Sequence, residues 1–138
     1  MERSDNYGFT ILEILVVLAI MGMVGSLVFV QLGEARARAR DAEREQEIKT
    51  LQNAFAIYAV NKGIYPIAEE PIPLTGKDAV SAALIAEDAI SQIPKDPLES
   101  DPYRYVYESP TGSTYTITYS LETSSISGKS KGSHTASP

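Results

Sequence analysis

The chain has no cysteine among its 138 residues, which excludes disulfide frameworks and cysteine-based zinc or redox sites. Its only histidine, His134, lies in a tail rich in Ser, Gly and Lys, which argues against a histidine-rich metal site and a His-based catalytic triad. A glycine-rich phosphate-binding loop is also missing. The formal net charge of −6 argues against a nucleic-acid surface. Because the sequence offers only scattered acidic groups for acid–base chemistry, we do not expect an enzyme.

A long stretch without charge lies close to the start of the chain. The twenty residues 14–33 include no Asp, Glu, Lys or Arg, and no proline occurs between Phe9 and Lys62. At about 1.5 Å of helix per residue, such a run is long enough to span the hydrocarbon core of a bilayer. Glu13 directly precedes it. A carboxylate at the edge of a membrane helix is costly unless it is paired, so Glu13 is a candidate functional residue.

Two ordinary explanations compete for this segment. A secretory signal peptide would need a basic start, a shorter apolar run and a small-residue cleavage site, whereas residues 1–8 hold one arginine and two acids. A plain membrane anchor explains the length and the hydrophobicity of the run. It gives no reason for Gly8 and Phe9 to precede Glu13 at this spacing.

The residues that follow Gly8 carry a resemblance to a known family. The stretch from Gly8 to Ile20, GFTILEILVVLAI, is similar to the class III signal of type IV pilins and type II secretion pseudopilins. The resemblance implies that residues 1–8 are a prepilin leader and that a prepilin peptidase cuts between Gly8 and Phe9. It also implies that the new amino group of Phe9 is N-methylated. The chain departs from the family in its weakly basic leader and in Val30, where many relatives have proline.

The same resemblance implies that residues 9–33 form a transmembrane helix that later becomes the core of a filament. Cleavage would leave a positive amine on Phe9, four residues before the negative Glu13. We expect these two groups to pair between neighbouring subunits of a homopolymer. Gly22 matches a glycine that is common in the family. Together with Gly25 it permits either local unwinding of the helix on assembly or close packing of helices.

Charged side chains follow the apolar run. Residues 34–50 hold five acidic and five basic residues among helix formers. Arg36, Arg40 and Arg44 recur at a spacing of four residues, which places them on one face of a helix. This arginine face is either solvated or contacts acidic surfaces of neighbouring subunits or lipid headgroups at the membrane exit.

The helix is predicted to continue into a small head domain over residues 34–122. Apolar residues recur on one helix face within residues 48–58, and Gly63 is a natural stop. We therefore expect one helix of about 50 residues, roughly 80 Å long, between Phe9 and Lys62.

Shorter elements are predicted after this helix. A proline-containing loop over residues 65–76 precedes a short helix over residues 78–92. Residues 103–107 and 115–121 are aromatic and β-branched, which predicts the two strands of a hairpin packed against the long helix. Residues 123–138 are mostly Ser, Thr and Gly, and we expect them to be disordered. The predicted fold class is α+β and pilin-like, with a long N-terminal helix against a small antiparallel sheet.

Three short motifs in the head carry a second, weaker resemblance. Residues 63–66, GIYP, 94–97, PKDP, and 101–105, DPYRY, look like those of the major pseudopilin of type II secretion. Such relatives have a Trp-Gly pair where this chain has Leu98 and Glu99. The resemblance favours a pseudopilin over other type IV filament subunits.

The resemblance also implies a calcium site in a later acidic loop. This chain has no acidic residue after Glu122, so that site is in doubt. Asp96, Glu99 and Asp101 could instead offer oxygen ligands to calcium, which needs six to eight of them. Carboxylates beside prolines are more often turn formers. We therefore expect no cofactor, with calcium at these three residues as the alternative.

The resemblance implies a structural subunit of a type IV filament, most similar to the subunit of the type II secretion pseudopilus that drives protein secretion. The alternatives are a type IV pilus pilin for adhesion, motility or DNA uptake, and a membrane-anchored binding module with an aromatic surface of tyrosines. Expected partners are further copies of the chain, prepilin peptidase and N-methyltransferase, an inner-membrane assembly platform with its motor ATPase, minor pilins or pseudopilins, and membrane lipid. No nucleic-acid partner is expected. The expected location is the bacterial inner membrane, as a single-pass protein with its head outside the cytoplasm, and then a periplasmic or extracellular filament.

Overall fold

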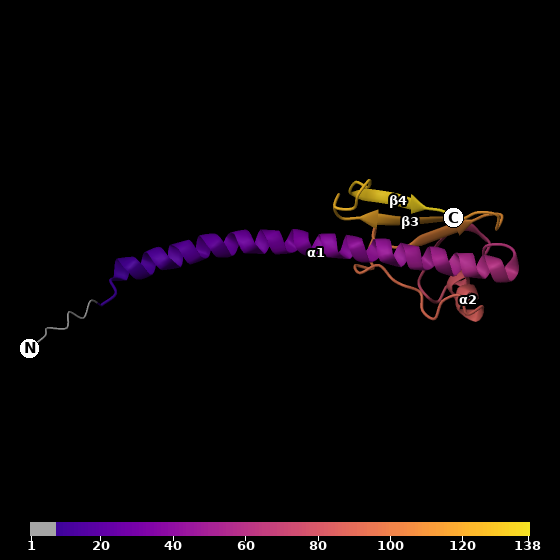
Figure 1. Ribbon diagram of the computed structural model, residues 1–138, viewed down its shortest axis with the longest axis horizontal. Coiled ribbons are helices and arrows are strands. Elements are labelled where there is room, and N and C mark those ends of the chain that lie inside the picture. Colours follow the sequence, from indigo (N-terminus) through magenta and orange to yellow (C-terminus); the bar gives the residue numbers. More distant parts are fainter. Residues whose placement is uncertain (1–7) are drawn as a thin grey trace, which may run out of the picture. The chain divides into compact units, whose positions relative to one another are not determined.

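A computed structural model describes residues 8–138, apart from the side chains of residues 27–30. The predicted leader therefore lies outside the described residues, except for Gly8. The chain divides into two compact units, Met1–Arg36 and Ala37–Pro138, and α1, Ile11–Lys62, contributes to both (Figure 1). The long helix predicted from the lack of proline is confirmed.

The second half of α1 forms one wall of the core of the head. Ile48, Leu51 and Phe55 are buried, which matches the predicted helical spacing of apolar residues. The helix ends at Lys62, where the backbone N–H of Gly63 donates to the carbonyl of Ala59 at 2.8 Å. Gly63 has a φ of +80°, a left-handed conformation that favours glycine, so its predicted role as the helix stop is confirmed.

Four antiparallel strands make up the sheet, in the spatial order β1-β2-β3-β4. Their bounds are Ala68–Pro73 for β1, Val106–Ser109 for β2, Thr116–Leu121 for β3 and Gly132–Ala136 for β4. The predicted hairpin corresponds to β2 and β3, which confirms the α+β, pilin-like fold class. Its first strand begins later than predicted, because the chain turns at residues 100–104, where Tyr103 N–H donates to Ser100 and Arg104 N–H to Pro102.

The sheet contains two strands that the sequence did not predict. β1 replaces the proline-containing loop predicted at residues 65–76, and it lies at the edge of the sheet. An edge strand tolerates Pro71 and Pro73 because a proline there removes no N–H that a neighbouring strand needs. The pairing of β1 with β2 is also irregular between Ala68 and Ile72.

The expected disorder of residues 123–138 is wrong for β4. This strand pairs with β3 over five successive positions, from Leu121 opposite Gly132 to Ile117 opposite Ala136. The side-chain amide of Gln52 in α1 also donates to the carbonyl of Ser137 at 2.8 Å. Backbone hydrogen bonds to β3 order this polar segment, although few of its own side chains are apolar.

The helix predicted over residues 78–92 is shorter in the structure. α2 comprises Ala79–Ala86, with Asp78 as its N-cap accepting from the N–H of Ser81 at 2.8 Å. Its chain direction changes at Asp88, which has a φ of +52°. The buried residues Ala89 and Ile93 continue to contribute to the core beyond the helix.

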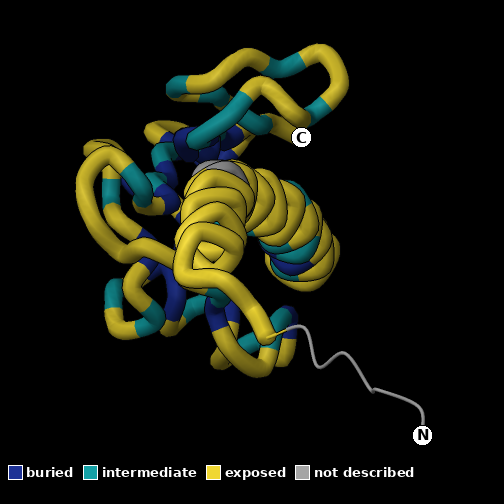
Figure 2. The backbone as a smooth tube through the Cα atoms, turned by 90° about the vertical axis from the view of Figure 1, so that its left-hand side faces the viewer, coloured by how far each residue is buried: buried dark blue, intermediate teal, exposed yellow. Residues whose placement is uncertain are grey.

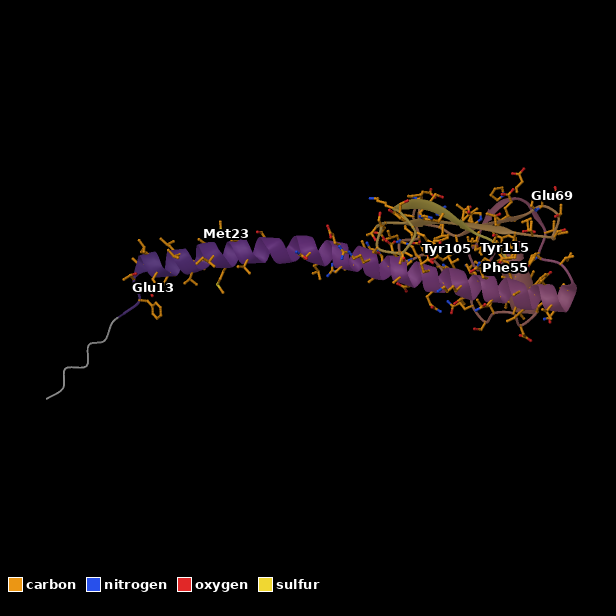
Figure 3. The ribbon with its side chains drawn as sticks, turned by 45° about the horizontal axis from the view of Figure 1, so that its top comes forward. Glu13, Met23, Phe55, Glu69, Tyr105 and Tyr115 are labelled. Atoms are coloured by element: carbon orange, nitrogen blue, oxygen red, sulfur yellow. The ribbon has the colours of Figure 1, made fainter. Side chains whose placement is uncertain are left out.

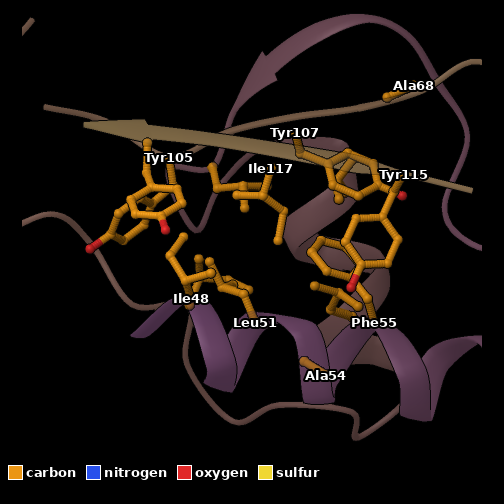
Figure 4. Packing of buried hydrophobic residues seen from close by; sticks show 14 of the residues in the cluster. Ile48, Leu51, Ala54, Phe55, Ala68, Tyr105, Tyr107, Tyr115 and Ile117 are labelled. Carbon is orange, nitrogen blue, oxygen red and sulfur yellow. The ribbon is translucent and has the colours of Figure 1, made fainter. Parts of the chain in front are cut away.

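Tyrosines fill much of the space between the sheet and α1. Tyr105, Tyr107 and Tyr115 are each at most 2% exposed, and Figure 4 shows them directed toward the helix that carries Leu51 and Phe55. The ring of Phe55 stacks on that of Tyr107 with centroids 4.4 Å apart. These rings are core, so they offer no aromatic surface for the alternative of a membrane-anchored binding module. In Figure 2, segments of the backbone of the head that carry buried residues are coloured dark blue.

Candidate functional site

The amino end of α1 begins with a capped turn. The hydroxyl oxygen of Thr10 accepts from the backbone N–H of Glu13 at 3.2 Å, and the Thr10 carbonyl accepts from Ile14 N–H at 3.3 Å. Thr10 and Glu13 have the spacing of a capping box, in which a hydroxyl residue precedes a glutamate by three positions. Sequence reasoning missed this capping role, although the Thr-x-x-Glu spacing was the signal that could have found it. The cap fixes where the apolar helix starts.

The residues predicted for processing are accessible next to this cap. Gly8 is exposed, and the side chain of Phe9 is 80% exposed. Glu13 is exposed in the first turn of α1, where a carboxylate also interacts favourably with the helix dipole (Figure 3). The structure therefore brings Gly8, Phe9 and Glu13 together at the start of one helix. Gly8 and Phe9 are both exposed and precede α1, so the bond between them is accessible from solvent in the described residues.

Among the described residues of its own unit, the apolar half of α1 has no packing partner. Large apolar side chains from Ile11 to Val24 are exposed, among them Met21 at 66% and Met23 at 74%. By length and composition, α1 is the one helix among the described residues that could cross a membrane, and none of its most apolar window is buried. Such a surface is stable only when lipid or other protein covers it.

Gly22 and Gly25 lie inside this unbroken helix. In the described part of the chain, a Cβ atom added at either glycine would meet nothing within 4 Å beyond the nearby backbone of the helix itself. The two positions therefore leave shallow gaps in the exposed apolar surface. Such gaps suit close approach of another helix, and the helix is not unwound at them in the single subunit.

The head contains a network of charged groups built around Arg44. Its guanidinium is fully buried and donates to Asp96 at 2.6 and 3.0 Å, to Asp41 at 2.8 Å and to Glu122 at 2.7 Å. Its Cζ also lies 4.7 Å from the ring centroid of Tyr103. Burial lowers the pKa of Arg44, but the hydrogen bonds to Asp96 and Glu122 outweigh burial and the net shift is upward. Arg44 therefore stays charged in the core.

Arg40 and Asp41 extend this network to the end of β3. Arg40 donates to both carboxylate oxygens of Glu122, at 2.7 and 2.5 Å, which lowers the pKa of Glu122. Asp41 accepts from the backbone N–H groups of Glu122 and Thr123 at 2.9 and 2.8 Å, and from the Thr123 hydroxyl at 2.6 Å. Burial raises the pKa of Asp41, but these hydrogen bonds outweigh burial and lower it overall.

The predicted arginine face is therefore divided. Arg36 is exposed, as a solvated face requires. The expectation of a solvated or intersubunit contact is wrong for Arg44, which is buried, and Arg40 pairs with Glu122 of the same chain. Asp41 lies three residues from Arg44 on the same helix, but Asp96 and Glu122 come from segments 52 to 82 residues away, so helix spacing did not indicate those two partners.

Two further carboxylates of α1 reach the sheet. Glu45 accepts from Lys129 at 2.6 and 2.8 Å and from the Tyr119 hydroxyl at 2.7 Å. Burial raises the pKa of Glu45, but the hydrogen bonds outweigh it and the net shift is downward. Glu47 accepts from the hydroxyl of Tyr105, and burial raises the pKa of Glu47.

The three carboxylates considered for calcium do not form a common site. Asp96 accepts from Arg44 and, at 2.9 Å, from the backbone N–H of Leu98. Glu99 pairs with Lys95 at 2.9 Å, and Asp101 with Arg104 at 3.4 Å. Over residues 8–138, the structure places no three His, Cys, Asp or Glu side chains where they could hold a metal ion together. Each of these acids has a basic partner of its own instead.

Comparisons with known proteins match both parts of the chain. A family model described as Type II secretion system (T2SS), protein G, matches residues 30–135. A second model, described as Prokaryotic N-terminal methylation motif, matches residues 3–29.

Curated relatives share the description of the first model. The Type II secretion system core protein G of Klebsiella michiganensis is 33% identical over 105 residues, which cover 73% of this chain and 74% of the relative. The protein of the same description from Escherichia coli is 31% identical over 106 residues, 73% of each chain. That from Vibrio cholerae is 28% identical over 108 residues, 76% of this chain and 73% of the relative. No solved structure gives a significant match.

Proposed function

Because the chain belongs to the family of type II secretion system protein G, we propose that it is a structural subunit of the pseudopilus that drives protein secretion. The observation that carries this proposal is the order of the two family matches along one chain. An amino-terminal methylation motif over residues 3–29 leads directly into a protein G match over residues 30–135. The chain is a structural subunit rather than an enzyme.

In the proposed assembly pathway, the subunit is first inserted in the membrane. The apolar half of α1 anchors the chain in the inner membrane, with the head outside the cytoplasm. Prepilin peptidase cuts between Gly8 and Phe9 and methylates the new amine of Phe9. The exposure of both residues beside a capped helix supports this step. An assembly platform and motor ATPase then move the subunit from lipid into a homopolymer with minor pseudopilins, and neighbouring helices replace lipid as the cover of the apolar surface.

Glu13 is proposed to set the position of each subunit in the filament. Once the chain begins at Phe9, its positive amine can reach the exposed carboxylate of Glu13 on a neighbouring copy. Both groups would then be surrounded by apolar helices. Leaving one of two such buried charges without its partner typically costs about 3–5 kcal/mol. A subunit placed one position out of register would incur that cost.

Mass spectrometry of the protein extracted from membranes of its host tests the proposed processing. We expect a chain that begins at Phe9 and carries one added methyl group. An intact Met1, or a cut at another peptide bond, would contradict the proposal.

Deletion of the gene tests the choice between a pseudopilus and a pilus. We expect the deletion to abolish secretion of exoproteins. Loss of twitching or of DNA uptake with normal secretion would point to a pilus instead.

Glu13→Gln tests the assembly role separately from membrane insertion. The substitution keeps the size of the side chain and removes its charge, so we expect normal membrane levels but loss of filaments and of secretion. Glu69→Gln is a matched control, because Glu69 is an exposed acid on β1 in the head (Figure 3). Filaments of Glu13→Gln at wild-type abundance, scored by electron microscopy after overexpression, would remove the proposed pair.

A further inference from the structure

The resemblance implies a calcium site in a later acidic loop, and the connection from β3 to β4, residues 122–131, is the last loop between strands in the described part of the chain. Calcium takes six to eight oxygen ligands, with carboxylates prominent among them. Glu122 is the only acidic residue of this connection, and its two oxygens already accept from Arg40 and Arg44. The residues present therefore do not fit the ion. We infer that the head replaces bound calcium with cations of its own, Arg44 and Lys129, which tie both ends of the connection to α1.

Arg44 holds the first end of the connection. Its guanidinium joins three separate parts of the head: Asp41 on α1, Asp96 in the loop after α2, and Glu122 at the end of β3. The Arg44 side chain is fully buried, and those of its partners are at most 14% exposed. A divalent ion bridging these carboxylates would have to displace a guanidinium that already satisfies them. Within the part of the chain that the structure describes, no buried side-chain polar atom is left without a hydrogen bond.

Asp41 fixes the backbone at the same end. It accepts from two successive backbone N–H groups, those of Glu122 and Thr123, and from the Thr123 hydroxyl. A calcium site needs backbone or side-chain oxygens directed at the ion, whereas these groups direct hydrogen at a carboxylate. The start of the connection is therefore shaped to receive an anion of α1.

Lys129 holds the second end of the connection. Its ammonium lies 2.6 and 2.8 Å from the two oxygens of Glu45 and 2.5 Å from the hydroxyl of Tyr119. It also lies 5.2 Å from the centroid of the Tyr119 ring. Since Glu45 is on α1 and Tyr119 on β3, Lys129 joins the helix, the sheet and the approach to β4. At this end, the connection therefore presents the positive side chain of Lys129 to Glu45 and not an acidic ligand to an ion.

Hydrogen bonds within the connection itself fix its middle part. The backbone N–H of Lys129 donates to the Ile126 carbonyl at 3.0 Å, and the N–H of Lys131 donates to the Ser124 hydroxyl at 3.1 Å. These hydrogen bonds occupy the Ile126 carbonyl and the Ser124 hydroxyl, two oxygens that a loop wrapped around an ion would have to redirect toward that ion. The connection therefore has a defined path from Glu122 to β4 with both ends held by basic side chains.

Thermal unfolding of the full chain in detergent micelles tests this inference. The near-ultraviolet circular dichroism of the buried tyrosines reports on the head, because the chain has no tryptophan. We expect the same melting temperature in excess EDTA and in millimolar calcium. Lys129→Met should lower the melting temperature by several degrees in both conditions, because it leaves Glu45 without its cation. Lys131→Met is the matched control: Lys131 is exposed in the same connection, and we expect no change.

Arg44→Met is the stronger variant, with an expected loss on the order of 10 °C or more, or no folded head at all. If that variant does not fold, the pair of Lys129→Met and Lys131→Met still decides. A wild-type melting temperature that rises with calcium by several degrees over EDTA would overturn the inference. Equal melting temperatures for Lys129→Met and Lys131→Met would overturn it as well.

Discussion

Gly112 lies where the turn between β2 and β3 approaches the segment that follows α1. Its carbonyl accepts from the N–H of Tyr65 at 2.9 Å, and its φ is +72°. An added Cβ would lie 3.0 Å from the backbone oxygen of Tyr65 and 3.3 Å from side-chain atoms of Ile64 and Ile67. Gly112→Ala should therefore lower the free energy of unfolding by about 2–3 kcal/mol, from backbone strain together with a forced shift of neighbouring backbone. Denaturant unfolding followed by near-ultraviolet circular dichroism measures this loss.

Gly128→Ala is the control that separates the two causes. Gly128 has a similar φ of +78°, but an added Cβ there would meet nothing within 4 Å. Backbone strain alone should cost about 1–2 kcal/mol. Equal losses for the two variants would show that the close approach to Tyr65 contributes nothing.

At the same scale, the sequence indicated some functional residues and concealed others. Gly8, Phe9 and Glu13 are neighbours in one linear motif, so the sequence alone predicts that they lie close together. The network around Arg44 could not be predicted in this way. Its partner Glu122 lies 78 residues away, and helix spacing reports only on positions three or four apart.

At the scale of elements, the strength of the local pattern decided what the sequence could predict. α1 has no proline and a regular apolar face, and β2 and β3 are rich in aromatic and β-branched residues. These elements were predicted in kind, with boundaries that differ by a few residues. β4 has the sequence Gly-Ser-His-Thr-Ala, whose order comes from the hydrogen bonds offered by β3 rather than from its own side chains. β1 was not predicted either, because its prolines argue against a strand. They are acceptable only because β1 lies at the edge of the sheet.

At the scale of the whole molecule, the two units depend on different surroundings. The first exposes apolar side chains that lipid or neighbouring helices must cover, whereas Ala37–Pro138 has its own core of buried aliphatic and aromatic residues. The charge network belongs entirely to this second unit. Hydrogen bonds from basic partners lower the pKa of Glu122 and, against the effect of burial, that of Glu45. The head should therefore be sensitive to acid.

The sign of this acid sensitivity follows from the direction of the pKa shifts. A carboxyl whose pKa is lower in the folded state stabilises the fold above its ordinary pKa, which is 4.5 for Glu122 and Glu45 and 3.8 for Asp41. That stabilisation is lost as the pH falls toward the folded-state pKa. Glu47 acts in the opposite direction, because burial raises its pKa, and it offsets part of the loss.

We therefore predict that the free energy of unfolding of the head is constant around neutral pH and falls as the pH drops below about 4.5. Urea unfolding of the full chain in micelles, followed by the near-ultraviolet signal of the tyrosines at a series of pH values, measures this profile. Glu122→Gln should be less stable at neutral pH and should lose less on acidification, because one lowered pKa is gone and Arg40 keeps only a neutral acceptor. Glu69→Gln alters an exposed acid of β1 and should keep the wild-type profile. A head whose stability is unchanged down to about pH 3, or a Glu122→Gln variant as sensitive to acid as the wild type, would contradict a stabilising role for this network.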